Sequence, residues 1–250
     1  MAIVTGGAEG IGYAIAEAFV TQGVTTIVTD INRVAGKQTA DKLASLGNRG
    51  EFIFADVSRA SQVEDVVTSV VASYGGINVL VNNAGIVNFE PLIEMSEANW
   101  DRLMDVDLKG VFLCTKFVLP HMIDQHSGVI LNISSNHAFA TLPDSEAYAA
   151  AKGGMIAFTQ GLAQSYGSRG IRAVAICPGY TDTPHYQYWL EQSPEPFARE
   201  KSTLALHPLG RIVRPDDIAK LVTFLASDDA AMITGTSVVV DGGVLSRLHF

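Results

Sequence analysis

Short apolar runs alternate along the chain with longer segments in which apolar residues recur at helical spacing. Runs that are apolar throughout are typical of strands buried on both faces, as in parallel sheets covered by helices. The pattern therefore predicts a single α/β domain over residues 1–250, in which helices cover both faces of a parallel sheet. The predicted strands are 2–5, 26–30, 51–55, 77–81, 128–134, 171–177 and 236–240, and the predicted helices are 10–22, 33–46, 60–74, 97–123, 146–167 and 215–227.

One segment, at about residues 180–210, interrupts this alternation. It follows the sixth predicted strand and is rich in aromatic residues, proline and charge, including Tyr180, His185, Tyr186 and Trp189. The carboxyl ends of parallel strands share one edge of the sheet, where α/β folds bind their ligands. The segment is therefore expected beside a ligand site, although an oligomer contact or an ordinary surface helix is an alternative interpretation.

A glycine-rich turn follows the first predicted strand and precedes the first predicted helix. Gly6, Gly10 and Gly12 permit a tight turn and a close approach of the backbone to a ligand. The helix start offers free N–H groups and a positive dipole end, which together suit a dinucleotide pyrophosphate. The spacing is Gly-x-x-x-Gly-x-Gly rather than the commoner Gly-x-Gly-x-x-Gly, and a turn without a ligand is the alternative.

An acidic residue at the end of the second predicted strand predicts the type of dinucleotide. Asp30 follows the glycine turn by about 20 residues, where a carboxylate can accept hydrogen bonds from the adenosine ribose hydroxyls. The same carboxylate would repel a 2′-phosphate, and Glu9 adds a second negative charge nearby. Arg33 is the one cation in this stretch suited to a 2′-phosphate, and Asp30 is better placed. The sequence therefore predicts NAD.

Composition narrows the class of protein. The chain has 250 residues, 48% of them hydrophobic, a formal net charge of −9 and a pI near 5.0. The acidic balance argues against nucleic acid and anionic membrane surfaces as partners, and apolar runs stay well short of the ~20 residues that span a bilayer. Cys114 and Cys177 fall in apolar segments and are typical of small core residues. We expect a cytoplasmic protein without a metal site.

Three residues in the second half of the chain can perform one kind of chemistry. Tyr148 and Lys152 are spaced i, i+4, so they share a helix face, and Ser135 stands at the end of an apolar strand. A neighbouring ammonium lowers the pKa of a phenol, which begins near ~10. A tyrosine with a lowered pKa can exchange a proton with an alcohol or ketone near neutral pH, and Ser135 can hydrogen-bond the same oxygen.

With these motifs the chain resembles the short-chain dehydrogenase/reductase family along nearly its full length. The resemblance implies a Rossmann-like, doubly wound sheet of seven strands in the order 3-2-1-4-5-6-7, and hydride transfer between nicotinamide and a carbonyl or secondary alcohol. It also implies that the 180–210 segment is a substrate lid and that the chain is a homo-oligomer, a tetramer or a dimer. The markers are Thr5-Gly6-x-x-x-Gly10-x-Gly12, Asp56-Val57, Asn82-Asn83-Ala84-Gly85, Ser135, Tyr148-x-x-x-Lys152, Pro178-Gly179 and Asp241-Gly242-Gly243.

The resemblance assigns roles to the catalytic residues. It implies that Tyr148 is the general acid/base, that Ser135 positions the substrate oxygen, and that Lys152 holds the nicotinamide ribose while it lowers the Tyr148 pKa. Ser134 should point to the other side of its strand. One position departs from the family: Asp107 stands where an asparagine usually holds a water that links the lysine to solvent. An aspartate can hold the same water and pair with Lys152, or it can make helix contacts alone.

The resemblance also implies a cofactor surface built along the whole strand edge. The glycine turn approaches the phosphates, the residues after the third and fourth strands flank the adenine and ribose, and those after the sixth hold the carboxamide. The implied cofactor residues are Gly6, Gly10, Ile11, Gly12, Asp30, Asp56, Val57, Asn83, Ala84, Gly85, Tyr148, Lys152, Pro178, Gly179, Thr181 and Thr183.

Substrate identity is the least constrained prediction. Polar groups beside the catalytic serine and tyrosine favour a sugar or polyol, since buried hydroxyls need hydrogen-bond partners. Reduction of β-ketoacyl, hydroxysteroid or cyclic ketone substrates is the alternative, and a regulatory protein that binds NAD without catalysis is the alternative from another class. The candidate substrate residues are Ser135, Asn136, His137, Glu146, Tyr148, Tyr180 and His185.

Overall fold

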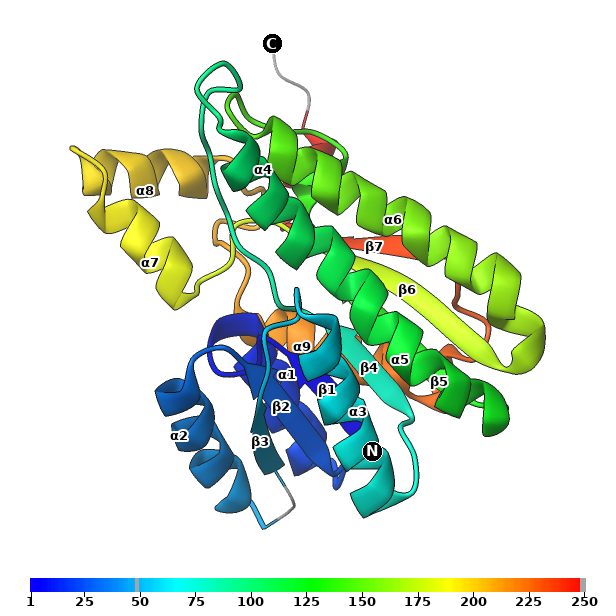
Figure 1. The fold of residues 1–250 in the computed structure, drawn as a ribbon. Coiled ribbons are helices and arrows are strands. Elements are labelled where there is room, and N and C mark those ends of the chain that lie inside the picture. Colours follow the sequence, from blue (N-terminus) through cyan, green and yellow to red (C-terminus); the bar gives the residue numbers. More distant parts are fainter. Residues whose placement is uncertain (48–49, 248–250) are drawn as a thin grey trace.

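The computed structural model describes residues 1–47 and 50–247. It forms seven parallel strands in the order β3-β2-β1-β4-β5-β6-β7, as expected (Figure 1). The strands are β1 (Ala2–Thr5), β2 (Thr26–Asp30), β3 (Gly50–Phe54), β4 (Val79–Asn82), β5 (Gly128–Ile133), β6 (Ile171–Pro178) and β7 (Thr236–Val240). The long helices are α1 (Gly10–Thr21), α2 (Arg33–Ala44), α3 (Ala60–Tyr74), α5 (Gly110–Asp124), α6 (Glu146–Tyr166) and α9 (Pro215–Ala226).

Alternating side chains of the central strands feed two separate cores. Val4, Val28, Val81 and Leu131 pack against α1 and α9 on one face of the sheet, while the residues one position earlier pack against α3 and α5 on the other face. This alternation follows from the period of two in a strand, and parallel strands buried on both faces are apolar at every position. The site is therefore supported on a sheet with no solvent-exposed face at its centre.

The predicted helix over 97–123 is interrupted. It consists of α4 (Glu97–Met104), a π-helical turn (Asp105–Lys109) and α5, with Asp107 buried in the turn. A π turn inserts one extra residue into a helix and occurs often at functional sites. Apolar periodicity does not report such an insertion, and the expectation of one regular helix was wrong at this turn.

Two short helices occupy the segment that breaks the alternation. They are α7 (Pro184–Glu191) and α8 (Pro196–Ala205), and each begins with a proline in its first turn. Proline suits that position because its missing N–H has no partner there. In Figure 1 this pair projects to one side of the sheet, beyond the carboxyl ends of the strands.

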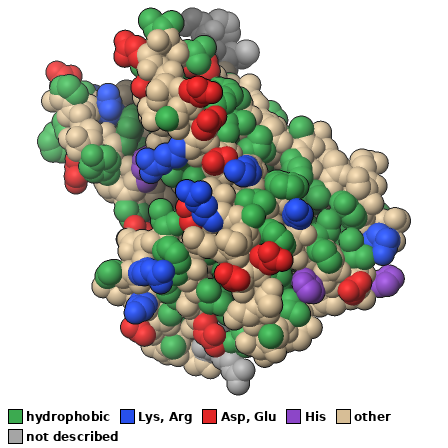
Figure 2. All heavy atoms as spheres, viewed as in Figure 1, with side chains coloured by type: hydrophobic (Ala, Val, Ile, Leu, Met, Phe, Trp, Pro, Cys, Tyr) green, Lys and Arg blue, Asp and Glu red, His purple; other side chains and the backbone are tan. Residues whose placement is uncertain are grey.

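The surface in the same view carries acidic and basic side chains interspersed, and no large area of one sign is visible on the described part of this face (Figure 2). Among the described residues, no helix is long and apolar enough to cross a membrane.

We expect Gly12→Ala to lower the free energy of unfolding by about 1–3 kcal/mol, the usual cost of overpacking. A Cβ at this position would lie 2.2 Å from the Gly6 carbonyl oxygen and 2.8 Å from the Gly7 Cα, both of which are backbone atoms. Gly161→Ala is the matched control, because its Cβ would meet nothing within 4 Å and alanine favours a helix by about 0.5–1 kcal/mol. Urea unfolding followed by circular dichroism checks both values, and equal midpoints would contradict the close approach.

Candidate active site

The candidate site lies at the carboxyl ends of the strands, between β1 and β4, where the order of successive strands changes from one side of the sheet to the other. At this switch point the loops that follow the two strands separate and leave a crevice. Two cavities occupy it, of about 750 Å³ and about 600 Å³. Asn83, Gly85 and Ile86 line both cavities, so the two form one continuous site.

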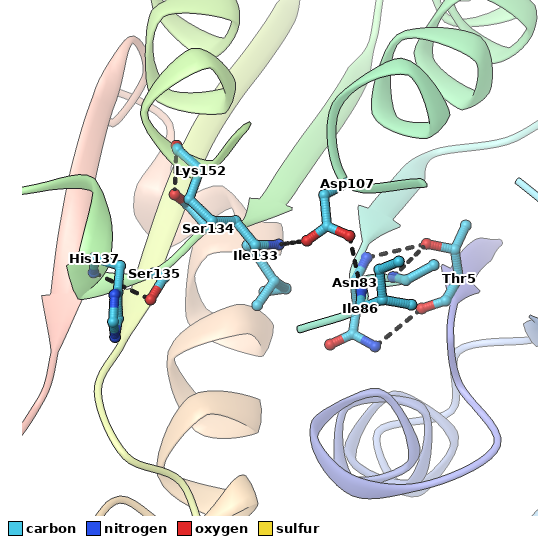
Figure 3. A network of polar contacts seen from close by, with 10 residues as sticks. Thr5, Asn83, Ile86, Asp107, Ile133, Ser134, Ser135, His137 and Lys152 are labelled. Atoms are coloured by element: carbon cyan, nitrogen blue, oxygen red, sulfur yellow. Dashed lines mark hydrogen bonds and ion pairs between the residues drawn. The ribbon is translucent and has the colours of Figure 1, made fainter. Parts of the chain in front are cut away.

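The end of β5 and the start of α6 bring the catalytic candidates together. Ser134 donates a hydrogen bond to the Lys152 carbonyl oxygen at 2.8 Å, which fastens the strand end to α6. Ser135, the next residue, is buried in the cavity wall, and its hydroxyl accepts a hydrogen bond from the His137 N–H at 3.1 Å. Tyr148 lines the same cavity. The two serines thus make different contacts, Ser134 with Lys152 and Ser135 with His137 (Figure 3). Ser135, Tyr148 and Lys152 line one cavity, as the spacing predicts.

Asp107 forms a buried ion pair with Lys152. The Lys152 Nζ lies 3.1 Å from Asp107 Oδ2, with the carboxylate side chain 0% and the lysine side chain 5% exposed. The second carboxylate oxygen accepts a hydrogen bond from the Ile86 N–H at 2.8 Å, and Nζ also donates to the Ile133 carbonyl oxygen at 3.3 Å. Figure 3 shows Asp107 between Lys152 and the backbone of Ile86. The interpretation of Asp107 as a partner of Lys152 is therefore favoured over helix contacts alone.

Gly85 packs closely beside this pair. A Cβ there would lie 3.1 Å from Asp107 Oδ2 and 3.3 Å from Lys152 Nζ. Any side chain would press against both charged atoms. The Asn82-Asn83-Ala84-Gly85 turn therefore seals one side of the ion pair as well as lining the cavities.

Burial and the ion pair decide the protonation states at the site. Burial raises the pKa of Tyr148, the Lys152 charge lowers it, Asp107 raises it and a hydrogen bond with Ser135 lowers it, with a net result above the ordinary value. Burial lowers the pKa of Lys152, but Asp107 and Tyr148 outweigh that effect and raise it, so the lysine is protonated at neutral pH. Lys152 thus acts in the expected direction, but the expected net lowering of the Tyr148 pKa is not found because burial, with a smaller contribution from Asp107, raises that pKa.

The glycine turn has the geometry of a phosphate cradle. Gly6 and Gly10 adopt positive φ angles of 59° and 56°. Glu9, the N-cap of α1, makes no side-chain capping hydrogen bond, so the first N–H groups of the helix lack a side-chain partner there. Such a start favours an anion. Ile11 lines the cavity beside Tyr148.

Asp30 projects into the adjoining cavity and is held in place by backbone donors. Its carboxylate accepts hydrogen bonds from Ala8 N at 3.2 Å and Asn32 N at 2.9 Å. The Arg33 guanidinium stacks on Phe54 at 3.5 Å from the ring centroid and does not line the cavity. These contacts leave Asp30, and not Arg33, at the position that would meet a ribose.

The remaining cofactor candidates line the cavities in different ways. Asn83 donates to the carbonyl oxygens of Thr5 and Gly6, so its side chain braces the glycine turn. Thr183 caps α7 by accepting a hydrogen bond from the Tyr186 N–H. The cofactor candidates that line the larger cavity are Gly6, Asp30, Asp56, Val57, Asn83, Ala84 and Gly85. The cofactor candidates that line the smaller cavity are Ile11, Asn83, Gly85, Tyr148, Lys152, Pro178, Gly179, Thr181 and Thr183.

The substrate end of the smaller cavity is mainly aromatic and apolar. The His137 ring stacks on Phe89 and meets the Tyr148 ring edge-on at 5.5 Å between centroids. Burial lowers the His137 pKa, so this imidazole is neutral at pH 7. Tyr180, which precedes α7, and Tyr186 and Trp189, which lie on α7, also line this cavity, and their rings contact one another.

Six of the seven substrate candidates of the sequence line this cavity, and one does not. Ser135, Asn136, His137, Tyr180 and His185 join Tyr148 there. Glu146, in the first turn of α6, is exposed and is not among the lining residues. It stands two residues before Tyr148, so the two side chains point in different directions from the helix.

Sequence reasoning missed Phe89 and the C-terminal residues Val244, Leu245 and Arg247, which also line the cavity. The C-terminal segment was assigned no part in the site from the sequence, and its last residues, 248–250, lie outside the described part of the chain. The C-terminal segment directly follows the Asp241-Gly242-Gly243 marker, and this position was the available sequence signal that the segment returns to the site.

Comparisons with known proteins agree with this geometry. A family model described as enoyl-(acyl carrier protein) reductase matches residues 6–245. The chain is 39% identical to the 2-(S)-hydroxypropyl-CoM dehydrogenase 3 of Xanthobacter autotrophicus, over 96% of this chain and 94% of that protein. It is 38% identical to the 3-oxoacyl-[acyl-carrier-protein] reductase of Thermotoga maritima, over 97% and 96%. The crystal structure of a putative short-chain alcohol dehydrogenase from Sinorhizobium meliloti superposes with a TM-score of 0.93 at 32% identity, covering 99% and 96%.

Proposed function

Because the chain belongs to the short-chain dehydrogenase/reductase family, we propose that it oxidises a secondary alcohol to a ketone with NAD. Members of this family are oxidoreductases that use a nicotinamide cofactor, NAD or NADP, on alcohols and ketones. The observation that carries the proposal is the cavity in which Ser135, Tyr148 and Lys152 converge beside the Asp30 cleft.

In the proposed reaction the protein residues manage the proton of the alcohol. Tyr148, as phenolate, accepts the hydroxyl proton, and Ser135 hydrogen-bonds the same oxygen and fixes its position. Lys152 stabilises the phenolate by its charge, and Asp107 keeps Lys152 protonated. The bound cofactor supplies the hydride acceptor. The aromatic lid excludes water, so these charges act at low dielectric.

The NAD part of the proposal is supported by the charges near Asp30. The Asp30 carboxylate has two backbone donors and lone pairs that remain for ribose hydroxyls. Glu9 lines the same cavity, and Arg33 is engaged on Phe54. A 2′-phosphate would meet two carboxylates there, which favours NAD over NADP.

We expect Asp30→Asn to raise KM for NAD by about tenfold, since a hydrogen bond to a charged group contributes about 1.5–3 kcal/mol. It should also lower KM for NADP, because the repulsion of the 2′-phosphate disappears. Initial rates with both cofactors give the ratio of the two kcat/KM values. Asp65→Asn, which removes an exposed carboxylate from α3, is the matched control and should leave the ratio unchanged. A wild-type preference for NADP would overturn the proposal for NAD.

The lining of the cavity bears on the substrate. Phe89, Leu142, Trp189 and Leu245 are apolar or aromatic, and Glu146, one of the polar groups that favoured a sugar or polyol, does not reach the cavity. We therefore infer a secondary alcohol on a largely apolar skeleton, with a polyol as the less supported choice.

A β-ketoacyl reductase is the second candidate. It is supported by the similarity to a 3-oxoacyl-[acyl-carrier-protein] reductase and by the apolar wall, which suits an acyl chain. Asp30 argues against a β-ketoacyl reductase that uses NADPH, because its carboxylate would repel the 2′-phosphate. Initial rates of NAD and NADP reduction over polyols, cyclic alcohols, hydroxy acids and hydroxysteroids, and of NADH and NADPH oxidation with acetoacetyl thioesters, separate the two. Turnover of polyols alone would reverse the inference about the skeleton.

The homo-oligomer, the cytoplasmic location and the lid function of 180–210 stay predictions.

A further inference from the structure

The C-terminal segment folds back over the substrate end of the cavity. After β7 the Asp241 carboxylate accepts hydrogen bonds from Gly243 N and Leu245 N, both at 2.8 Å. Gly242 and Gly243 adopt positive φ angles of 64° and 92°, which L side chains rarely adopt. This turn directs Leu245 and Arg247 to the cavity wall.

Arg247 is the one charged side chain of that wall without an opposite charge. Among the described residues that line the cavity, the charged side chains are Asp107, Lys152 and Arg247, and the first two neutralise each other. No carboxylate of the described residues lies within ion-pair distance of Arg247. The substrate end of an acidic protein, of net charge −9, therefore carries a net positive charge.

The guanidinium has donors that its known contact does not use. Its Nη1 donates to the Ala205 carbonyl oxygen in the last turn of α8, at 2.5 Å. A guanidinium has five N–H donors in a planar fork that matches a carboxylate. Arg247 is exposed to solvent at the rim of the cavity, and the described residues that line the cavity with it offer no unpaired carboxylate.

We propose that Arg247 binds an anionic oxygen group of the substrate, such as a carboxylate, on the part of the molecule remote from the reacting alcohol. This inference rests on the proposed function and specifies its substrate class: a hydroxy acid whose apolar portion lies among the lid aromatics. The contact with Ala205 orients the guanidinium, so one arginine both joins the C-terminal segment to α8 and recognises the acid.

A purely structural role for Arg247 is the competing explanation. If Arg247 served only to fasten α8, its removal would loosen the lid for every substrate alike. Recognition of an anion changes KM only for substrates that carry the charge. Paired substrates that differ in that charge therefore separate the two explanations.

The experiment compares two acids with their neutral amides: 3-hydroxybutyrate with 3-hydroxybutyramide, and 4-hydroxycyclohexanecarboxylate with its carboxamide. Wild type, Arg247→Gln, Arg247→Lys and the control Arg169→Gln are assayed at saturating NAD. Arg169 is exposed in a turn before β6, at the opposite end of the sheet. Unfolding midpoints and the Kd for NAD establish that each variant is folded.

We expect the wild type to have a lower KM for an acid than for its amide. Arg247→Gln should raise the KM of the acid about tenfold more than the KM of the amide, as expected for a charge-assisted hydrogen bond at a partly exposed site; any change shared by acid and amide reports the lost contact with Ala205. Arg247→Lys should restore part of the difference. Higher ionic strength should raise the KM of the acid in the wild type but not in Arg247→Gln.

Three results would overturn the inference. An equal rise in KM for acid and amide in Arg247→Gln would assign Arg247 a structural role only. A wild type that prefers the amides would exclude recognition of the anion. If the wild type turned over neither member of either pair but oxidised other alcohols, the substrate class would be wrong while the proposed function stood; if it oxidised no alcohol in the wider panel, the proposed function itself would fail.

Discussion

Tyr148→Phe should lower kcat for alcohol oxidation by about a thousandfold, within the range of about 10²–10⁴ contributed by a positioned general base. The substitution removes one oxygen and keeps the ring, which packs edge-on against His137 and Phe89. The Kd for NAD should change little, because the Asp30 cleft and the glycine turn are untouched. Steady-state rates and NADH fluorescence titration measure the two effects separately.

The alternative bases near Tyr148 are poor substitutes for its phenolate. Ser135 has an ordinary hydroxyl, and His137 is neutral and hydrogen-bonded through Nδ1 to Thr141. Tyr166→Phe, at the far end of α6, is the control and should keep full activity. Turnover in Tyr148→Phe close to that of the wild type would show that another group accepts the proton. If the wild type shows no turnover but binds NAD, a regulatory NAD-binding protein becomes the better explanation.

Local sequence patterns predicted the frame of the site well. Strands buried on both faces are apolar at every position, so β1, β4 and β5 could be placed by inspection. Because the carboxyl ends of parallel strands meet at one edge, Asp30 and Ser135 could be assigned to one site although they are distant in sequence. The Rossmann-like order of the strands came from the family resemblance and is confirmed.

The features that the sequence did not predict depend on contacts between distant segments. The π turn at Asp105–Lys109 adds a residue without disturbing the apolar pattern. Arg247 reaches the cavity because Asp241 holds the turn after β7, and the marker at Asp241 does not show which residue of the following segment lines the cavity. Glu146 precedes Tyr148 closely but faces solvent, since neighbours on a helix point in different directions.

The net pKa of Tyr148 illustrates the same limit. The i, i+4 spacing correctly placed Lys152 beside the phenol, and that charge lowers the pKa as expected. Burial and the carboxylate of Asp107 raise this pKa, and the spacing of residues in the sequence does not show how large either effect is. The departure from the usual asparagine was visible in the sequence, but its effect depends on the 3.1 Å contact with Lys152.

Asp107→Ala should lower the free energy of unfolding by about 3–5 kcal/mol, because it leaves the buried Lys152 ammonium without its counter-ion. It also removes the acceptor of the Ile86 N–H. Asp107→Asn keeps an oxygen for that N–H and should cost less. Urea unfolding of both variants at neutral pH, where Lys152 is charged, gives the two values. Equal stability of Asp107→Ala and wild type would contradict a net contribution from the pair.

We expect Asp107→Asn to change the pH dependence of catalysis as well, and the charges of Asp107 and of the Tyr148 phenolate determine the direction of the change. Oxidation requires Tyr148 as phenolate, so kcat/KM rises as pH rises through the pKa of that phenol. Asp107 raises this pKa, because a nearby negative charge disfavours a second one. Its replacement by a neutral amide should therefore move the acidic limb of the kcat/KM profile to lower pH. Asp105→Asn, an exposed carboxylate two residues away, is the control and should leave the limb in place. A limb that moves to higher pH would show that Asp107 acts mainly by keeping Lys152 charged, and a limb that does not move while Asp107→Ala is destabilised would restrict Asp107 to a structural role.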